Sequence, residues 1–478
     1  MSLAVLTWPQ QPEPVYHTHT EFAEAADAGC CPNGNFLKGA KWSPDGACLL
    51  TASDDKWLRV YDLPQDALTR PSEAAAAEDA AAAAARDAER RAGGAAAGAS
   101  GRGASAGGGD SLRSALRVHA GESVYDYAWF SAMSTADPAS CCFASTTRGH
   151  PIHLWDACSG QLRCSYRAHD DADDPTAAFS VAFSPDGSKL LGGYAKCFRL
   201  FDVSRPGRDC RKVATQRRDK EGSMAGIVSC LAFNPPTADL LAAGTYSGAV
   251  GLFDGRAAEA QLMLLEGHKG GVTQARAPGV LFSRDGNYLY SGARRDGRVI
   301  CWDVRAAAAP LYELPRDAAA TNQRLGFSID PSNRHLATGG CDGRVRVFDL
   351  RDGSEVGSFQ AAADTVSGCD LHPVMGLPLL ATASGHRRYP LAPGSDDEGE
   401  GGGGGGGAPL ARDCNALRLW RLGFEWEAAD GGAAGAAEAA AAAAGEGAAA
   451  AAAQGAGGGS GGGFGEGAYG GGLPYVTV

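Results

Sequence analysis

The sequence predicts an all-β fold, a propeller of seven blades, from two repeated signals. Runs such as LRVYD, which ends at Asp62, and IHLWD, which ends at Asp156, alternate around an aromatic residue as half-buried β-strands do. Seven such runs occur, and four of the six spacings between their last residues lie between 46 and 52, a period typical of propeller blades. A turn that contains proline in six of its seven copies precedes the second strand of each predicted unit.

Two low-complexity insertions explain the longer spacings. The first spacing, 94 residues, contains the Ala/Gly/Ser-rich segment 65–112, and without this segment it becomes 46. The last spacing, 72 residues, contains the segment 391–411, and without it becomes 51. Such segments lack the apolar residues that independent folding requires. We therefore expect both to interrupt the propeller without adding a blade.

Each predicted unit contains four strands, which is typical of the WD40 type of propeller. One four-stranded sheet cannot bury both of its faces, whereas seven sheets packed radially can. The seven units span residues 35–422, but the last unit lacks an outer strand before Leu422. We expect the N-terminal segment 1–34 to supply that strand, through residues 15–20. We expect the Gly/Ala-rich tail 423–478 to be disordered.

Several residues of the repeat are expected to serve the fold rather than a ligand. Trp302 should pack between blades, Asp303 should tie a turn, and His268 should complete a buried hydrogen-bond network. The residues assigned to the repeat's structure are Asp62, Trp155, Asp156, Asp202, Asp254, His268, Trp302, Asp303, Asp349 and Trp420.

Composition and motifs argue against an enzyme. The chain has 478 residues and a formal net charge of -12, which disfavours a uniformly basic nucleic-acid binder. Its 14 cysteines form no CxxC pair, and scattered free thiols suit the cytosol or the nucleus. No phosphate-binding loop or GxSxG motif occurs outside low-complexity sequence, and no apolar run is long enough for a bilayer. His17 and His19 share a face but lack a third metal ligand, so we expect no metal site there. Taken with the missing motifs, this predicts no catalytic residue, cofactor, metal or small-molecule substrate.

Basic residues nevertheless gather on one predicted rim, the top face. The top face bears the turns between second and third strands and the loops that enter the inner strands. Residues 205–220 form the densest basic stretch, whereas acidic residues cluster at 170–174 and 395–400. A basic rim suits phosphates, and nearby amide and aromatic groups suit unpaired bases, although acidic peptides also bind basic propeller faces. The RNA-binding candidates are Arg217, Arg218, Lys220, Lys269, Arg294, Arg295, Asn322, Gln323, Arg324, His386, Arg387 and Tyr389.

Longer segments resemble the telomerase Cajal body protein 1 family. They include NFLKGAKWSPDG (35–46), SVYDYAWFSAMS (123–134), SGARRD (291–296), TNQR (321–324) and LLATASGHR (379–387). The resemblance implies a nuclear seven-bladed propeller that binds the CAB-box loop of small Cajal body RNAs and telomerase RNA. It implies box H/ACA proteins and telomerase as partners, delivery of the particle to Cajal bodies, a role in telomere maintenance, and a monomer within the particle. An additional cytoplasmic pool is left open.

This sequence departs from the family in three places. The acidic N-terminal extension of animal members is missing from it, the Ala/Gly-rich segments 65–112 and 423–478 are peculiar to it, and ARAPG at 275–279 interrupts an expected inner strand. A protein-interaction adaptor is the alternative to an RNA-binding protein. Trp302 to Arg305 fit the WDxR pattern of substrate receptors of cullin-4 ubiquitin ligases, although the WD repeat itself supplies most of that pattern.

Overall fold

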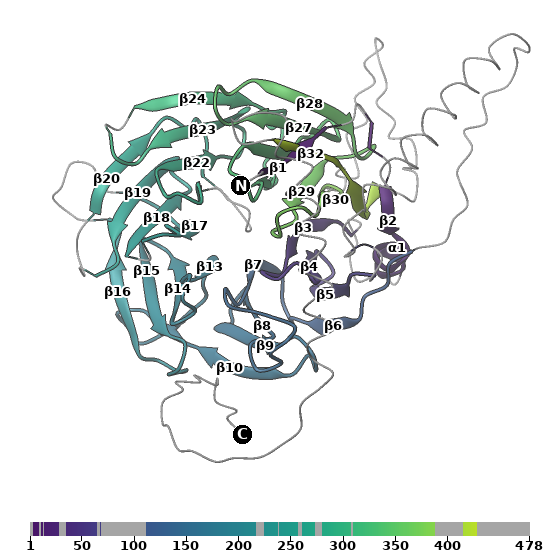
Figure 1. Cartoon of the computed structure of the whole chain (residues 1–478). Helices are drawn as coiled ribbons and strands as arrows, with labels where there is room; N and C mark the ends of the chain where they lie inside the picture. The colour runs from purple at the N-terminus through teal and green to yellow at the C-terminus, as the bar shows by residue number, and fades with distance from the viewer. Residues whose placement is uncertain are drawn as a thin grey trace, which may run out of the picture.

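The protein is a ring of seven four-stranded antiparallel sheets, arranged radially as blades (Figure 1). The predicted fold class and number of blades are thereby confirmed. The computed structural model describes residues 3–8, 11–12, 14–27, 35–64, 67, 111–216, 224–237, 239–256, 261–272, 280–306, 309–387 and 414–427. Within those ranges no helix is both long and apolar enough to cross a membrane.

Blades one to four follow each other along the chain, each with its inner strand first. Blade one comprises β3 (Leu37–Trp42), β4 (Cys48–Ser53), β5 (Trp57–Asp62) and β6 (Leu116–His119). Blade two comprises β7 (Val124–Trp129), β8 (Cys142–Thr147), β9 (Ile152–Asp156) and β10 (Leu162–Tyr166). A small hairpin of β11 (Ala168–His169) and β12 (Pro175–Thr176) precedes blade three, which comprises β13 (Ser180–Phe183), β14 (Lys189–Tyr194), β15 (Cys197–Asp202) and β16 (Cys210–Ala214). Blade four comprises β17 (Val228–Phe233), β18 (Leu240–Thr245), β19 (Ala249–Asp254) and β20 (Gln261–Glu266).

Blades five and six repeat this order, and blade seven combines both ends of the propeller. Blade five comprises β21 (Val280–Phe282), β22 (Tyr288–Gly292), β23 (Arg298–Asp303) and β24 (Pro310–Pro315). Blade six comprises β25 (Phe327–Ile329), β26 (His335–Gly339), β27 (Arg344–Asp349) and β28 (Glu355–Gln360). Blade seven comprises β29 (Val366–Leu371), β30 (Leu379–Ser384), β31 (Leu417–Arg421) and, as its outer strand, β2 (Pro14–Thr18).

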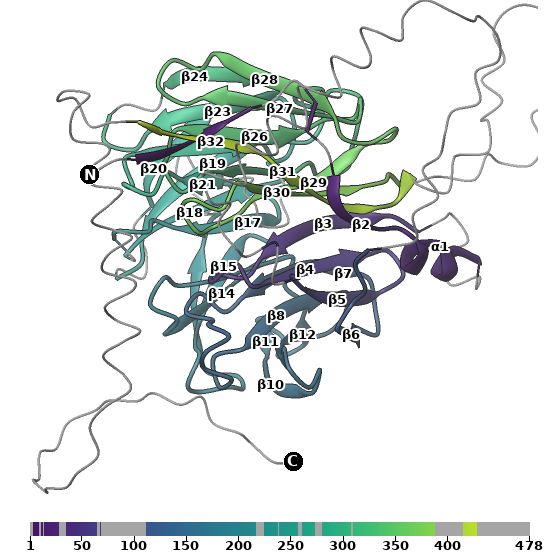
Figure 2. The same cartoon turned by 45° about the vertical axis from the view of Figure 1, so that its right-hand side comes forward.

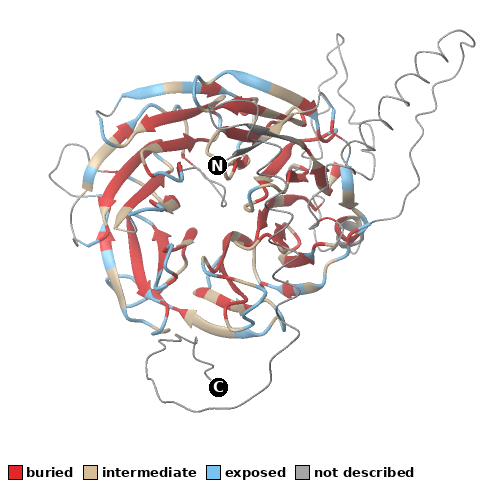
Figure 3. Ribbon diagram, in the orientation of Figure 1, coloured by how far each residue is buried: buried red, intermediate tan, exposed pale blue. Residues whose placement is uncertain are grey.

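The cores lie between neighbouring blades. All six residues of β4 and all six of β30 are buried, because each second strand is covered by a blade on both sides. Burial decreases from the middle strands to the outer strands (Figure 3). Trp302 packs in a cluster with Val250 and Leu252 of blade four, so its indole joins blades four and five.

The N-terminal segment closes the ring. Tyr16 of β2 lies opposite Leu419 of β31, and Thr18 lies opposite Leu417. The strand ends two residues before the end of the expected range 15–20, because helix α1 (Thr20–Asp27) begins there. The helix lies at the outside of the ring beside β2 and blade one (Figure 1, Figure 2).

Two expected boundaries are corrected. The start of the tail is not disordered: residues 423–427 form β32 (Gly423–Glu427), which pairs with β1 (Leu3–Thr7). The segment 65–112 contains residues that pack, since Ala67 and Leu112 are 2% and 3% exposed in the cluster that also holds Phe22. The rest of both expected segments, 65–66, 68–110 and 428–478, lies outside the described residues, as do ARAPG at 275–279 and the insertion 391–411.

Helix α1 fastens blade one through Glu21. The Glu21 carboxylate is 6% exposed, accepts hydrogen bonds from Tyr61 Oη (2.9 Å) and the Ser114 backbone N–H (3.0 Å), and pairs with Arg117 (2.8 Å). Burial alone raises the pKa of Glu21, but the hydrogen bonds from Ser114, Tyr61 and Arg117 together lower it below its ordinary value of 4.5. The ionised carboxylate therefore stabilises the folded chain.

Replacement of this carboxylate should destabilise the protein in a pH-dependent way. Because the folded-state pKa of Glu21 is lowered, its stabilisation is complete above the unfolded-state value of 4.5 and disappears as the pH falls through the folded-state value. Glu21→Gln should lower the free energy of unfolding by about 1–3 kcal/mol at neutral pH, and by less in acid. Denaturant unfolding at several pH values measures this. Glu122→Gln, at an exposed carboxylate paired with Lys56, is the control, and an equal loss at every pH would contradict the prediction.

Residues 71–109 of the insertion and 428–478 of the tail, which contain few large apolar side chains, should be dispensable for the stability of the propeller. Excision of residues 71–109 and 428–478 leaves Ala67, Leu112 and β32 in place, and is expected to shift the melting temperature by less than about 2 °C. Leu112→Ala in the intact chain is the opposite control, and should cost about 2–5 kcal/mol because that side chain is buried. A fall of more than about 5 °C in the truncated chain would show that an excised segment packs on the propeller.

Candidate functional site

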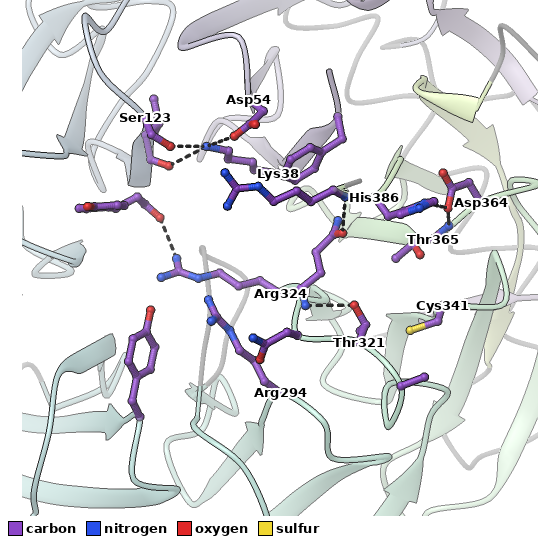
Figure 4. A pocket seen from close by; sticks show the side chains of 18 residues that line it. Lys38, Asp54, Ser123, Arg294, Thr321, Arg324, Cys341, Asp364, Thr365 and His386 are labelled. Atoms are coloured by element: carbon purple, nitrogen blue, oxygen red, sulfur yellow. Dashed lines mark hydrogen bonds and ion pairs between the residues drawn. The ribbon is translucent and has the colours of Figure 1, made fainter. Parts of the chain in front are cut away.

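A pocket of about 560 Å³ opens at the centre of the top face, where loops of several blades converge (Figure 4). Its lining comes from blades one, two and four to seven. Six of the twelve RNA-binding candidates line this central pocket: Arg294, Asn322, Gln323, Arg324, His386 and Arg387. Residues far apart in the sequence are thus brought to one place by the closure of the ring.

Bulges in the inner strands turn two further side chains into the pocket. The register of β3 shifts between Leu37 and Gly39, and the register of β7 shifts between Val124 and Asp126. The extra residues are Lys38 and Tyr125, and a bulge of this kind redirects its side chain. Both line the central pocket. Tyr125 was not among the candidates, because a regular alternation in SVYDYAW gives no sign of a bulge.

The guanidinium of Arg324 extends from the loop that enters β25 across the pocket to blade two (Figure 4). Its Nη1 donates a hydrogen bond to the Tyr125 carbonyl oxygen at 2.7 Å. On the blade-one side, the Lys38 ammonium donates to Ser123 Oγ at 2.9 Å and pairs with Asp54 at 3.1 Å. Two cations, one from blade one and one from the loop that enters blade six, are therefore held in place in the same pocket.

Arg294 and Arg295 are not equivalent, although both follow β22. The Arg294 guanidinium lines the pocket and lies 5.1 Å from the ring centre of Tyr246. Arg295 is exposed, does not line the pocket, and adopts a φ of 52° while its N–H donates to the Thr321 carbonyl oxygen. Of these two candidates only Arg294 lines the central pocket, and a role in RNA binding stays a prediction for both.

Positively charged side chains outnumber negatively charged ones in the lining of the central pocket. Four Lys or Arg residues line it against two aspartates, Asp54 and Asp364. Burial alone raises the pKa of Tyr246, but the nearby guanidinium groups of Arg324 and Arg294 outweigh burial and lower it. Burial also lowers the pKa of Lys38. The charges of Arg324 and Arg387 lower it further, whereas the Asp54 carboxylate acts in the opposite direction. The pocket therefore favours a negatively charged ligand.

Amide and imidazole groups complete the rim on the side of blades six and seven. Gln323 Nε2 donates to the Gly385 carbonyl oxygen at 2.8 Å, and Gln323 Oε1 accepts the Arg387 N–H at 3.3 Å. His386 Nδ1 lies 2.6 Å from Asp364 Oδ1. Asn322 is exposed at the pocket. These groups offer hydrogen bonds of a kind suited to base edges.

The remaining candidates lie elsewhere. Lys269 is exposed but does not line the pocket, and its N–H donates to Asp296 Oδ2 at 3.2 Å. Arg217, Arg218, Lys220 and Tyr389 lie outside the described residues. In the basic stretch before them, Lys212 pairs with Asp171 at 2.6 Å and Arg208 pairs with Asp173. The acidic segment 170–174 therefore lies against the basic stretch, rather than apart from it as the sequence suggested.

The residues assigned to the repeat form hydrogen bonds within and between strands. His268 is bonded to Asp296 (2.8 Å) and Ser291 (2.7 Å), and Ser291 also accepts the Trp302 indole N–H (2.7 Å). The indole N–H groups of Trp155 and Trp420 likewise donate to hydroxyls of their second strands at 2.8 Å. The aspartates that accept hydrogen bonds or ion pairs near the ends of third strands are Asp62, Asp156, Asp202, Asp254, Asp303 and Asp349.

The repeat is recognised at the family level. The family described as WD domain, G-beta repeat matches residues 29–62, 259–303 and 324–349. These segments include β3 to β5 of blade one, β20 of blade four, β21 to β23 of blade five and β25 to β27 of blade six. The match agrees with the four-stranded blades of the structure.

Curated relatives extend the similarity over most of the chain. Telomerase Cajal body protein 1 of Mesocricetus auratus is 39% identical over 402 residues, which cover 82% of this chain and 65% of the relative. The Homo sapiens protein of that name is 40% identical over 375 residues, 77% of this chain and 60% of the relative. The Drosophila melanogaster homolog is 33% identical over 360 residues, 74% of this chain and 58% of the relative. This chain thus spans less than two thirds of these relatives, and over the span of its propeller it belongs to the telomerase Cajal body protein 1 family.

Proposed function

We propose that this protein is a non-catalytic RNA-binding subunit that recognises an unpaired loop of small Cajal body RNAs and telomerase RNA, of the CAB-box type. It directs the box H/ACA ribonucleoprotein to Cajal bodies in the nucleus and so supports telomere maintenance. Its partners are the box H/ACA proteins and telomerase, and it acts as one copy within the particle. It requires no cofactor.

The observation that carries this proposal is the convergence of Lys38, Arg294, Arg324 and Arg387 in one pocket. An RNA backbone supplies the negative charge that this pocket favours. The amides of Asn322 and Gln323 lie at the same rim, where they can read the edge of an unpaired base. The names of the curated relatives, which refer to telomerase and the Cajal body, support the choice of RNA particle.

No specific observation favours the adaptor alternative. In the WDxR segment, the Arg305 guanidinium pairs with Asp303 at 2.8 Å, and Arg351 pairs with Asp349 at 2.8 Å in the next blade. Arg256 contacts Asp254 in the preceding blade in the same way. A contact repeated in three successive blades serves to fix the turn after the third strand, which accounts for the pattern without a ubiquitin ligase.

Removal of a pocket cation should weaken RNA binding without unfolding the protein. Arg294→Ala should reduce the affinity for a random pool of single-stranded RNA, about twelve nucleotides long, by about tenfold. The slope of log affinity against log salt should fall by about 0.7, the value for one phosphate contact with a single strand. Fluorescence anisotropy at several salt concentrations measures both quantities.

Arg305→Ala is the matched control, because Arg305 belongs to the same blade at the opposite rim. It should leave affinity and salt slope unchanged. Equal effects of the two substitutions, or none from Arg294→Ala, would contradict the proposal. In cells, sequencing of RNA crosslinked to the protein should recover box H/ACA RNAs that contain a shared loop element, and Arg294→Ala should deplete them.

Substitution of two different arginines of blade five should affect stability in one case and RNA binding in the other. Arg298 donates to Asp296 (3.0 Å), Glu313 (2.6 Å) and the Gly267 carbonyl oxygen (2.9 Å), so it ties blade five together. Arg298→Ala should lower the free energy of unfolding by about 1–3 kcal/mol, whereas Arg294→Ala should lower it by less than about 0.5 kcal/mol. Thermal unfolding of the two variants tests this. A larger loss of stability in Arg294→Ala would mean that its effect on RNA is indirect.

A further inference from the structure

Tyr125 and Phe179 separate the central pocket from a second hollow on the top face. Their rings are stacked, with ring centres 5.3 Å apart and planes inclined by 22°. Both side chains are half-buried, and Tyr125 lines the central pocket as well as the second hollow. The second hollow, here called the blade-three groove, has a volume of about 1160 Å³ and includes Phe179 in its lining.

The blade-three groove is lined by further cations. Lys196 is exposed on the turn between β14 and β15, and Lys212 lies on the outer strand β16. Arg199 is only 8% exposed and is stacked over Tyr194 at 5.5 Å. Its buried Nε has no hydrogen-bond partner among the described residues, so a charged donor is already withdrawn from water beside the groove. This arrangement of cations beside stacked rings is typical of surfaces that bind single-stranded nucleic acid.

Of the two aspartates that line the groove, Asp170 and Asp171, the second is weakly held. Asp171 pairs with Lys212, but its side chain is 92% exposed, and such surface pairs contribute little stability. Asp170, in contrast, accepts the N–H groups of Ala172 and Asp174 and holds the loop between β11 and β12. A phosphate can therefore replace Asp171 at Lys212 without unfolding this loop.

We propose that Tyr125 and Phe179 form a stacking platform over which a single-stranded RNA passes from the central pocket into the blade-three groove. Bases stack on the exposed ring surface, and Lys196 and Lys212 bind the following phosphates. This inference rests on the proposed RNA-binding function. It assigns the RNA a second subsite and a direction across the top face, from blades six and seven toward blade three.

A purely structural role for the ring pair is the competing explanation. The rings join blade two to the segment that enters blade three, so under this explanation their loss destabilises the contact between the two blades. Phe179→Leu separates the two roles, because leucine retains an apolar side chain of similar bulk but offers no aromatic face. The phosphate contacts have their own control: Lys189 is exposed on β14 of the same blade, at the end of the strand opposite to Tyr194.

The test compares two random RNA pools on the full-length protein, one of about three nucleotides and one of about ten. The short pool is measured by competition against the long one. Phe179→Leu should weaken binding of the long pool by about tenfold and leave the short pool within about twofold. Lys196→Ala and Lys212→Ala should each reduce the salt slope of the long pool by about 0.7, and Lys189→Ala should not. The melting temperature of Phe179→Leu should stay within about 2 °C of the wild type.

Three results would overturn the second subsite. If Phe179→Leu changes neither pool while Arg294→Ala weakens both, RNA occupies the central pocket alone and the proposed function stands. If Phe179→Leu weakens both pools equally, or lowers the melting temperature by more than about 5 °C, the ring pair is a structural joint. If polyglutamate displaces the long pool as well as RNA does, the groove binds an acidic chain, since a carboxylate chain has no base to stack.

A separate result bears on the proposed function itself. If Arg294→Ala affects neither pool, that function fails, and the second subsite fails with it.

Discussion

The pairing of β2 with β31 is the contact on which the rest of the ring depends. A blade buries its two faces only when both neighbours are present, and an unclosed ring would leave blades one and seven each with an apolar face in water. The joint is reinforced by α1, which follows β2 directly. Phe22 of α1 is fully buried in a cluster that contains Tyr61 of blade one and Leu379 and Leu419 of blade seven. Strand β2 and helix α1 thus hold both sides of the closing joint, and the top-face loops meet at the axis as a result.

The contacts that lock neighbouring blades also create the candidate site. The extra residue of an inner-strand bulge contacts the next blade: Ser367 Oγ donates to the Leu37 carbonyl oxygen at 2.7 Å, and Lys38 reaches Ser123 of blade two. Tyr125 does the same with an aromatic face, which meets Phe179. A serine hydroxyl at such a position only makes the hydrogen bond to the next blade and offers nothing to a ligand. A lysine or a tyrosine also contributes a charge or a ring to the lining of the central pocket, so the joint becomes part of the site.

The sequence predicts the fold well because the period of the repeat is a consequence of the blade itself. Trp302 and His268 could be assigned to the structure for the same reason, since their partners lie in the same blade. The site is predicted only in part. Six candidates converge because the top-face turns of any propeller point to one rim, but Arg294 and Arg295 differ by a turn conformation that no spacing reveals. Pairing of Lys212 with Asp171 was missed because it joins an outer strand to a loop about forty residues away.

A chain of net charge -12 can present a positive face because its arginines are used in two ways. At the ends of the third strands, Arg256, Arg305 and Arg351 each donate a backbone N–H at 2.9 Å to the aspartate two positions earlier and place their guanidinium on the same carboxylate. Charge there is neutralised locally in each of blades four, five and six. At the opposite rim the cations come from different blades and meet at the axis, where Arg324 and Arg294 act together on Tyr246. The positive face therefore results from ring closure and not from composition, which is why the net charge of the chain alone points away from a nucleic-acid ligand.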